Sequence, residues 1–125
     1  MHQTLERMVQ SAALDELIRS LEALVAALRC DPETAWFEIF DARLAEARSL
    51  AGSAAPTIDV RQLARDVLDS FRGGMGSFND YAPVRYEEAS RAWQAIPGLE
   101  HERELADDVH DKAVTLLTSG SDASL

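Results

Sequence analysis

Hydrophobic residues recur with helical spacing over the first part of the chain. Between residues 11 and 30 they return at every third or fourth position, so they fall on one side of a helix while charged side chains take the other side. The hydrophobic positions are Leu14, Leu17, Ile18, Leu21, Leu24, Val25 and Leu28. This pattern predicts an amphipathic helix, which residues 5–12 extend toward the start of the chain.

A second helical pattern covers residues 32–51. Asp31 can cap the start of this helix, Pro32 suits the first helical position, and Gly52 ends the pattern. Because only a short break separates this helix from the first, the two should form an antiparallel hairpin.

Three more helices are predicted in the remainder of the chain. A linker at residues 52–57 precedes the third, for which Asp59 and Gln62 form a candidate capping box. The fourth and fifth follow from the spacing of two hydrophobic sets: Tyr86, Ala89, Trp93 and Ile96, then Leu105, Val109, Ala113, Leu116 and Leu117. No window alternates as a half-buried strand would. We therefore expect an all-α fold, an antiparallel bundle of four to five helices, with residues 1–118 as one domain and residues 119–125 as a disordered tail.

Length and hydropathy narrow the class of protein. A chain of 125 residues is expected to form one domain. Its hydrophobic runs are far shorter than the ~20 residues of a membrane span, and its first residues lack the features of a secretion signal. We therefore expect no membrane insertion and a cytoplasmic location. Arginine far outnumbers lysine and alanine is abundant, which favours a bacterial origin.

The charge of the chain points to a type of partner. The formal net charge is −10, from 22 acidic and 12 basic residues. Nucleic-acid binding needs cationic contacts to phosphate and is therefore disfavoured. A negative field speeds encounter with positive surfaces, so a protein partner with a basic surface is favoured.

Residues 71–81 read F-R-G-G-M-G-S-F-N-D-Y and are dense in glycine. Gly73 or Gly74 can end a helix in the left-handed conformation, and Ser77, Asn79 or Asp80 can cap the next helix. A phosphate-binding loop is the alternative, but the lysine of G-x-x-x-x-G-K-[ST] is missing and no predicted strand precedes the run. A structural turn is favoured, and a protein-contact surface or a small-ligand site stays open. The residues of this predicted loop are Gly73, Gly74, Met75, Gly76, Ser77, Phe78 and Asn79.

The run G-G-M-G-S-F-N-D, from Gly73 to Asp80, resembles the hallmark of a family of small uncharacterised bacterial proteins, a domain-of-unknown-function family. Members of that family have a leading helix hairpin, this loop, and a closing helix similar to L-A-D-D-V-H-D-K-A at residues 105–113. They commonly continue with aliphatic residues after the loop, where this chain has Tyr81-Ala82-Pro83. The resemblance implies a helical fold and a bacterial origin, and it assigns no activity.

The predicted closing helix carries a row of polar side chains. His101, Glu104, Asp108 and Asp111 fall within an arc of about 80° on a helical wheel, facing away from the hydrophobic stripe. A carboxylate–imidazole row of this kind is compatible with a solvated acidic face, a docking surface for a basic partner or a divalent metal site. Because there is no H-E-x-x-H pattern and the row points outward, we expect no metal ion and no cofactor.

Aromatic residues and catalytic patterns complete the set of candidates. Most of the tryptophans and tyrosines should lie in the core, and Tyr81 and Tyr86 are the aromatic residues expected to be exposed, as anchors of an interface. No serine, cysteine or lysine has a base nearby in the sequence that would activate it as a nucleophile. Adjacent carboxylates on a helix diverge by about 100° and form no catalytic pair.

These observations favour a non-catalytic, acidic, protein-binding module, specifically a bacterial immunity protein that neutralises a cognate toxin by occluding a basic site. The expected partner-binding residues are His101, Glu104, Asp108, Asp111, Asp80, Tyr81 and Tyr86. One alternative is a small-ligand or metal-dependent enzyme that uses residues 73–80 and the carboxylates of the last helix. The other is a homodimeric structural or adaptor protein whose interface is the first helix hairpin.

Overall fold

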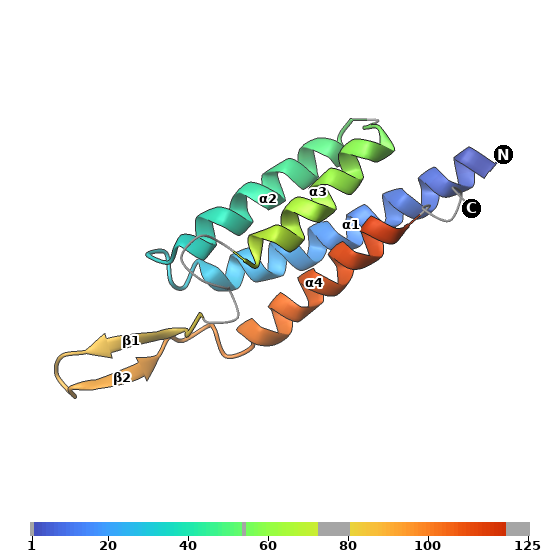
Figure 1. The fold of residues 1–125 in the computed structure, drawn as a ribbon. Helices are drawn as coiled ribbons and strands as arrows, with labels where there is room; N and C mark the ends of the chain where they lie inside the picture. Colours follow the sequence, from blue (N-terminus) through green and yellow to red (C-terminus); the bar gives the residue numbers. More distant parts are fainter. Residues whose placement is uncertain (1, 54, 73–80, 120–125) are drawn as a thin grey trace.

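The protein is mostly helical, with one small antiparallel sheet (Figure 1). The computed structural model describes residues 2–53, 55–72 and 81–119. Its elements along the chain are α1 (His2–Leu28), α2 (Ala35–Ala51), α3 (Thr57–Ser70), β1 (Val84–Glu87), β2 (Ala92–Ala95) and α4 (Glu102–Thr118). The predictions for the loop at residues 73–80 and for residues 120–125 of the predicted tail fall outside the described residues. Ser119, the first residue of the predicted tail, is the C-cap of α4, and its N–H donates to the Leu116 carbonyl.

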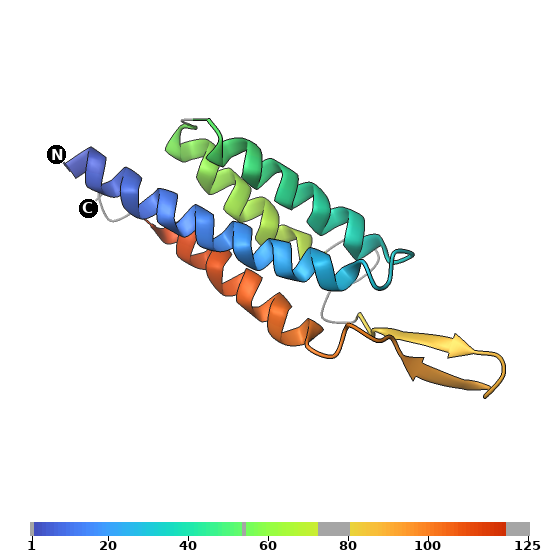
Figure 2. The same ribbon diagram turned by 180° about the vertical axis from the view of Figure 1, so that it is seen from behind.

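The four helices form a bundle around one hydrophobic core, as the hydrophobic spacing predicts. α1 packs against α2 and α4, and α3 packs against the same two helices from the other side (Figures 1 and 2). α1 and α2 form the predicted antiparallel hairpin. The core side chains with no exposed surface include Leu17, Leu21, Leu24, Leu28, Phe40, Val67, Val109 and Leu116. Removing such side chains from water is the main force that holds the bundle together.

The predicted starts of α2 and α3 are wrong in detail. α2 is capped by Thr34, whose Oγ1 accepts a hydrogen bond from the Trp36 N–H at 3.4 Å. Asp31 does not cap this helix, because its carboxylate accepts a hydrogen bond from the Tyr81 hydroxyl at 2.7 Å. α3 begins directly after Pro56 and has no side-chain cap. Asp59 therefore lies inside its first turn.

The predicted fourth helix is a β-hairpin. β1 and β2 pair antiparallel with Val84 opposite Ala95, Arg85 opposite Gln94, Tyr86 opposite Trp93 and Glu87 opposite Ala92. The short runs V-R-Y-E and A-W-Q-A place Val84 and Tyr86 two residues apart on one face of the ribbon, with Trp93 directly across from Tyr86. The expectation of a fold without strands is therefore wrong.

The hairpin projects from one end of the bundle, and its base is fixed to the core (Figures 1 and 2). Ile96 and Leu99, in the connection between β2 and α4, are buried. Between them Gly98 has a φ of +97°, and a Cβ at this position would collide with the Cys30 sulfur. Together with the Tyr81–Asp31 hydrogen bond, these contacts attach both ends of the hairpin to the loop that joins α1 to α2.

Candidate functional site

The outward face of α4 is acidic, as predicted. The side chains of His101 and Glu104 are 74% and 80% exposed, and His101 Nδ1 lies 3.6 Å from Glu104 Oε2. Asp111 is also exposed, on the same side of the helix. Asp107 joins this face at i+3 from Glu104, although it is absent from the predicted row. We call Glu104, Asp107 and Asp111 the acidic face.

Asp108 is 49% exposed and also contacts the neighbouring helix α1. Its Oδ2 accepts a hydrogen bond from the Ser20 hydroxyl of α1 at 2.5 Å, and Ser20 is buried. Its Oδ1 lies 3.5 Å from the Lys112 ammonium one turn further along α4. The predicted partner-binding role of Asp108 therefore competes with a contact that joins α4 to α1.

Two glutamates at the start of α4 have shifted pKa values of opposite sign. The Gly98 N–H lies 3.1 Å from both carboxylate oxygens of Glu100, and this hydrogen bond lowers the pKa of Glu100. Burial raises the pKa of Glu102, the neighbouring Asp107 raises it further, and Arg103 opposes the increase. Glu102 points into the bundle and is 5% exposed, so Glu100, and not Glu102, adds to the negative surface.

The exposed aromatic side chains lie on the hairpin. Tyr86 and Trp93 contact each other edge to face, with ring centroids 5.5 Å apart, and they are 45% and 67% exposed. Val84, which is 39% exposed, and Ala95 share their side of the ribbon because they occupy the neighbouring pair of the same parity. We call Val84, Tyr86, Trp93 and Ala95 the aromatic face of the hairpin.

The structure corrects the predicted aromatic anchors in two respects. Trp93, expected in the core, is among the most exposed large hydrophobic residues in the described part of the chain. Tyr81, expected to be exposed, is half-buried against the core, and burial together with its hydrogen bond to Asp31 raises the pKa of its hydroxyl. Of the two predicted tyrosines, Tyr86 has the expected exposure and Tyr81 does not.

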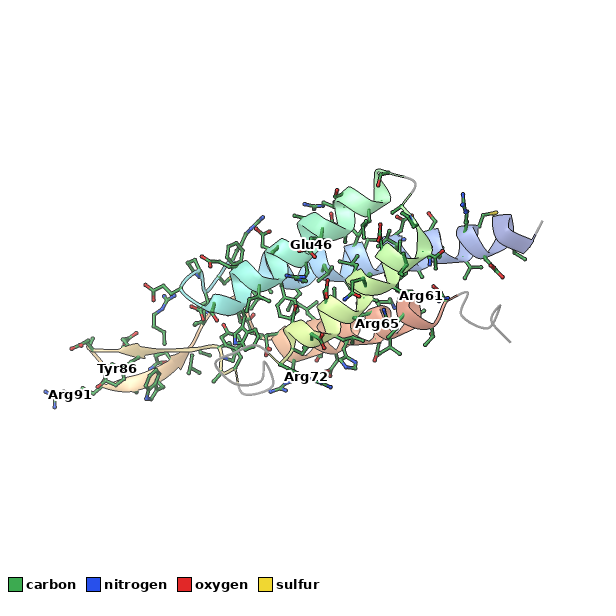
Figure 3. All side chains as sticks on the ribbon, turned by 45° about the horizontal axis from the view of Figure 1, so that its top comes forward. Glu46, Arg61, Arg65, Arg72, Tyr86 and Arg91 are labelled. Atoms are coloured by element: carbon green, nitrogen blue, oxygen red, sulfur yellow. The ribbon has the colours of Figure 1, made fainter. Side chains whose placement is uncertain are left out.

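A row of three arginines lies on α3 and just after its end (Figure 3). Arg61 and Arg65 are four residues apart and share one side of α3, and Arg72 lies two residues past the end of that helix. The Arg61 guanidinium donates to the Ser119 carbonyl at 3.5 Å, whereas Arg65 and Arg72 are exposed and have no ion pair among the described residues. Positive side chains therefore gather in one place although the net charge of the chain is −10, and the sequence analysis did not identify this group.

The described residues offer little that could hold a metal ion or a small molecule. Within the described residues, no three His, Cys, Asp or Glu side chains gather closely enough to hold a metal ion. An open hollow of about 350 Å³ lies at the end of the bundle away from the hairpin, between α1 and the α2–α3 connection. Its charged lining residue is Arg7, and Gln10 in the same hollow lies 3.5 Å from the Thr57 hydroxyl.

The predicted site residues therefore divide into three groups. Glu104 and Asp111 lie on α4, His101 is the residue directly before that helix, and Tyr86 lies on the hairpin, which residues 96–101 join to α4. Asp108 and Tyr81 make contacts inside the protein. Asp80 and residues 73–79 lie outside the described residues. Trp93 and Asp107 were not predicted as site residues. The sequence signal for Trp93 was its spacing from Tyr86, which fits two short strands that meet across a turn.

Comparison with known proteins adds no assignment. No family model matches the chain, and no curated protein or solved structure is significantly similar to it. The resemblance of residues 73–80 to a bacterial family therefore stays a prediction. Within the described part of the chain, no helix combines the length and hydrophobicity that crossing a membrane would require.

Proposed function

We propose that this chain is a non-catalytic protein-binding module that occludes a basic site on a partner protein. The observation that carries the proposal is the aromatic face, because a tyrosine and a tryptophan with this much exposed surface stand on a ribbon that projects from the bundle (Figure 3). Aromatic side chains of this size dominate the binding energy of interfaces, provided that they become buried in a well-packed pocket.

The acidic face supplies the second part of the proposed interface. Its first residue, Glu104, follows the end of β2 by nine residues, and the start of α4 lies at the end of the bundle from which the hairpin projects (Figure 1). Exposed carboxylates such as Glu104 contribute to the encounter rate with a positive surface and little to the lifetime of the complex. The aromatic face would then set the lifetime. Fast association through the acidic face and slow dissociation through the aromatic face are the properties that a protein needs to find and block a basic cleft.

A bacterial immunity protein that neutralises a toxin is the specific form of this proposal. A toxin that acts on a polyanion needs a basic active-site cleft, and a ribbon that is fixed at its base beside an acidic helix face is complementary to such a cleft. The base of the ribbon is anchored by Ile96, Leu99 and Tyr81, so little conformational freedom at the base is lost on binding.

The test uses the protein encoded beside this chain in its genome as the candidate partner. Association and dissociation rates would be measured at low and high salt for the wild type, for Trp93→Ala, and for Glu104 and Asp107 both changed to Ala. Trp93→Ala should increase the dissociation rate about tenfold or more. The double carboxylate variant should slow association at low salt and leave dissociation almost unchanged.

Arg65→Ala is the control, since it changes the net charge on α3 and alters no residue of the hairpin or of α4. Its association rate should stay close to that of the wild type. If Arg65→Ala changes association as much as the loss of a carboxylate does, the net charge and not the acidic face controls encounter. If Trp93→Ala binds as tightly as the wild type, the hairpin is not the binding element and the proposal is wrong.

A further inference from the structure

The outer edge of β1 offers unused hydrogen-bonding groups. The Ile96 N–H donates to the Pro83 carbonyl at 2.9 Å, which fixes the phase of the antiparallel ladder. Hydrogen-bonded pairs recur every second residue, so Arg85 with Gln94 and Glu87 with Ala92 are also hydrogen-bonded pairs between β1 and β2. The N–H and C=O of Tyr86 point away from β2.

This edge is open to another chain. The Val84 N–H is already donated to the Ala82 carbonyl at 2.8 Å, so Tyr86 carries the first backbone N–H and C=O on the outer side of β1 that have no partner among the described residues. The two strands contact each other far more than they contact any helix, and the ribbon extends beyond the ends of the helices (Figures 1 and 2). An isolated two-stranded ribbon is at best marginally stable in water, and added strands stabilise it.

The charges on the polar side of β1 are self-complementary. Arg85 and Glu87 precede and follow Tyr86 along β1, and their side chains share the face of the ribbon opposite the Tyr86 ring. Their cross-strand partners Gln94 and Ala92 are uncharged. Neither residue makes an ion pair within the described part of the chain. When two copies of β1 pair antiparallel with Tyr86 opposite Tyr86, Arg85 of each copy lies opposite Glu87 of the other.

Other registers and the other edge lack this complementarity. A twofold axis at Arg85 or at Glu87 places like charges directly opposite each other, which destabilises the pair. A shift by one residue mixes the aromatic face with the polar face. The outer edge of β2 carries no charged residue between Ala92 and Ala95, so nothing there selects a register.

We propose that two copies of this chain pair through the outer edges of β1, around a twofold axis at Tyr86, to form a four-stranded antiparallel sheet. In this register the two Tyr86 residues exchange two backbone hydrogen bonds, and two Arg85–Glu87 pairs form at the closer, non-hydrogen-bonded positions of the ladder. The aromatic faces of the two ribbons then make one continuous surface. The inference does not depend on a basic partner, because it uses the edge of the ribbon and not its aromatic face.

The test is the dimer dissociation constant of the full chain and of charge-swapped variants. Light scattering and sedimentation from about 10 µM to about 1 mM should show a concentration-dependent monomer–dimer equilibrium for the wild type. Arg85→Glu and Glu87→Arg each place like charges at both crossings of the symmetric pair, so each should raise the dissociation constant roughly tenfold or more. The double variant R85E/E87R restores both pairs and should return it to within about threefold of the wild type.

Arg91→Glu is the matched control for Arg85→Glu, because it makes the same charge change in the turn outside β1 (Figure 3). It should leave the dissociation constant unchanged, and melting curves of all variants at low concentration report whether the bundle is intact. A wild-type chain that stays monomeric throughout the range overturns the proposal. So does a double variant as weak as the single ones, or a control as weak as Arg85→Glu. A monomeric chain would leave the proposed binding of a basic partner standing, since that binding has its own test.

Discussion

The contact between Ser20 and Asp108 separates structural from functional carboxylates on α4. Asp108→Ala removes the acceptor of a buried hydroxyl, and leaving such a group without a partner costs about 1–3 kcal/mol. Ser20 lies inside a helix and can turn back toward the carbonyl four residues earlier, so the cost should fall near the lower part of that range, about 1.5 kcal/mol. Loss of the Asp108–Lys112 pair adds about 0.3 kcal/mol. The expected loss in the free energy of unfolding is about 2 kcal/mol, or roughly 6–10 °C in melting temperature for a chain of this size.

Glu104→Ala provides the control from the same helix. It removes the same charge one turn earlier, but its side chain is 80% exposed and its contact is the surface pair with His101. Its effect should stay below about 0.5 kcal/mol. Urea unfolding followed by circular dichroism measures both variants, and Ser20→Ala completes a double-mutant cycle with Asp108→Ala. The contact between α1 and α4 would be refuted if Asp108→Ala and Glu104→Ala had the same stability. It would also be refuted if the coupling energy between Ser20 and Asp108 were near zero.

Three further variants test the start of α4 and the base of the hairpin. Burial raises the pKa of Glu102, so the folded protein keeps this proton to higher pH than the unfolded chain and loses stability as pH rises through that window. Glu102→Gln should therefore melt above the wild type at about pH 7 and together with it at about pH 3, and no gain at the higher pH would contradict the burial. Gly98→Ala should lower the free energy of unfolding by about 1–2 kcal/mol because of the left-handed backbone at this position. The new Cβ also collides with the Cys30 sulfur, so the loss should be smaller when Cys30 is changed to Ala as well. An equal loss with and without Cys30→Ala would exclude the collision. Tyr81→Phe should lose about 1 kcal/mol with its hydrogen bond to Asp31, and an unchanged melting curve would show that water replaces this bond without loss.

The helices were predictable because each repeats its hydrophobic spacing over several turns. The stripe from Leu14 to Leu28 fits no other regular structure, and α4 repeats it from Leu105 to Leu117. The hairpin was not predictable on the same grounds, because its strands have four residues each. The spacing of Tyr86, Trp93 and Ile96 fits a helix as well as it fits two strands around a turn, so the hydrophobic pattern alone does not separate the two.

The site was predictable where it depends on one helix and unpredictable where it depends on a neighbour. The exposure of Glu104 and Asp111 follows from the helical wheel of α4 alone. The role of Asp108 depends on the position of Ser20, 88 residues earlier in the chain, and no local pattern contains that information. Tyr81 is a similar case, since its hydrogen bond to Asp31 forms when the chain returns to the end of α1.

The edge and the face of the hairpin can serve two partners at once. Pairing along the edge of β1 uses the backbone of Tyr86 and the charges of Arg85 and Glu87, which lie on the polar side of the ribbon. Binding on the aromatic face uses the rings of Tyr86 and Trp93 on the opposite side. Strand addition also stabilises a ribbon that is marginal alone, so a dimer would present its aromatic rings with less conformational entropy left to lose. Dimerisation and occlusion of a basic site are therefore compatible, and the first should strengthen the second.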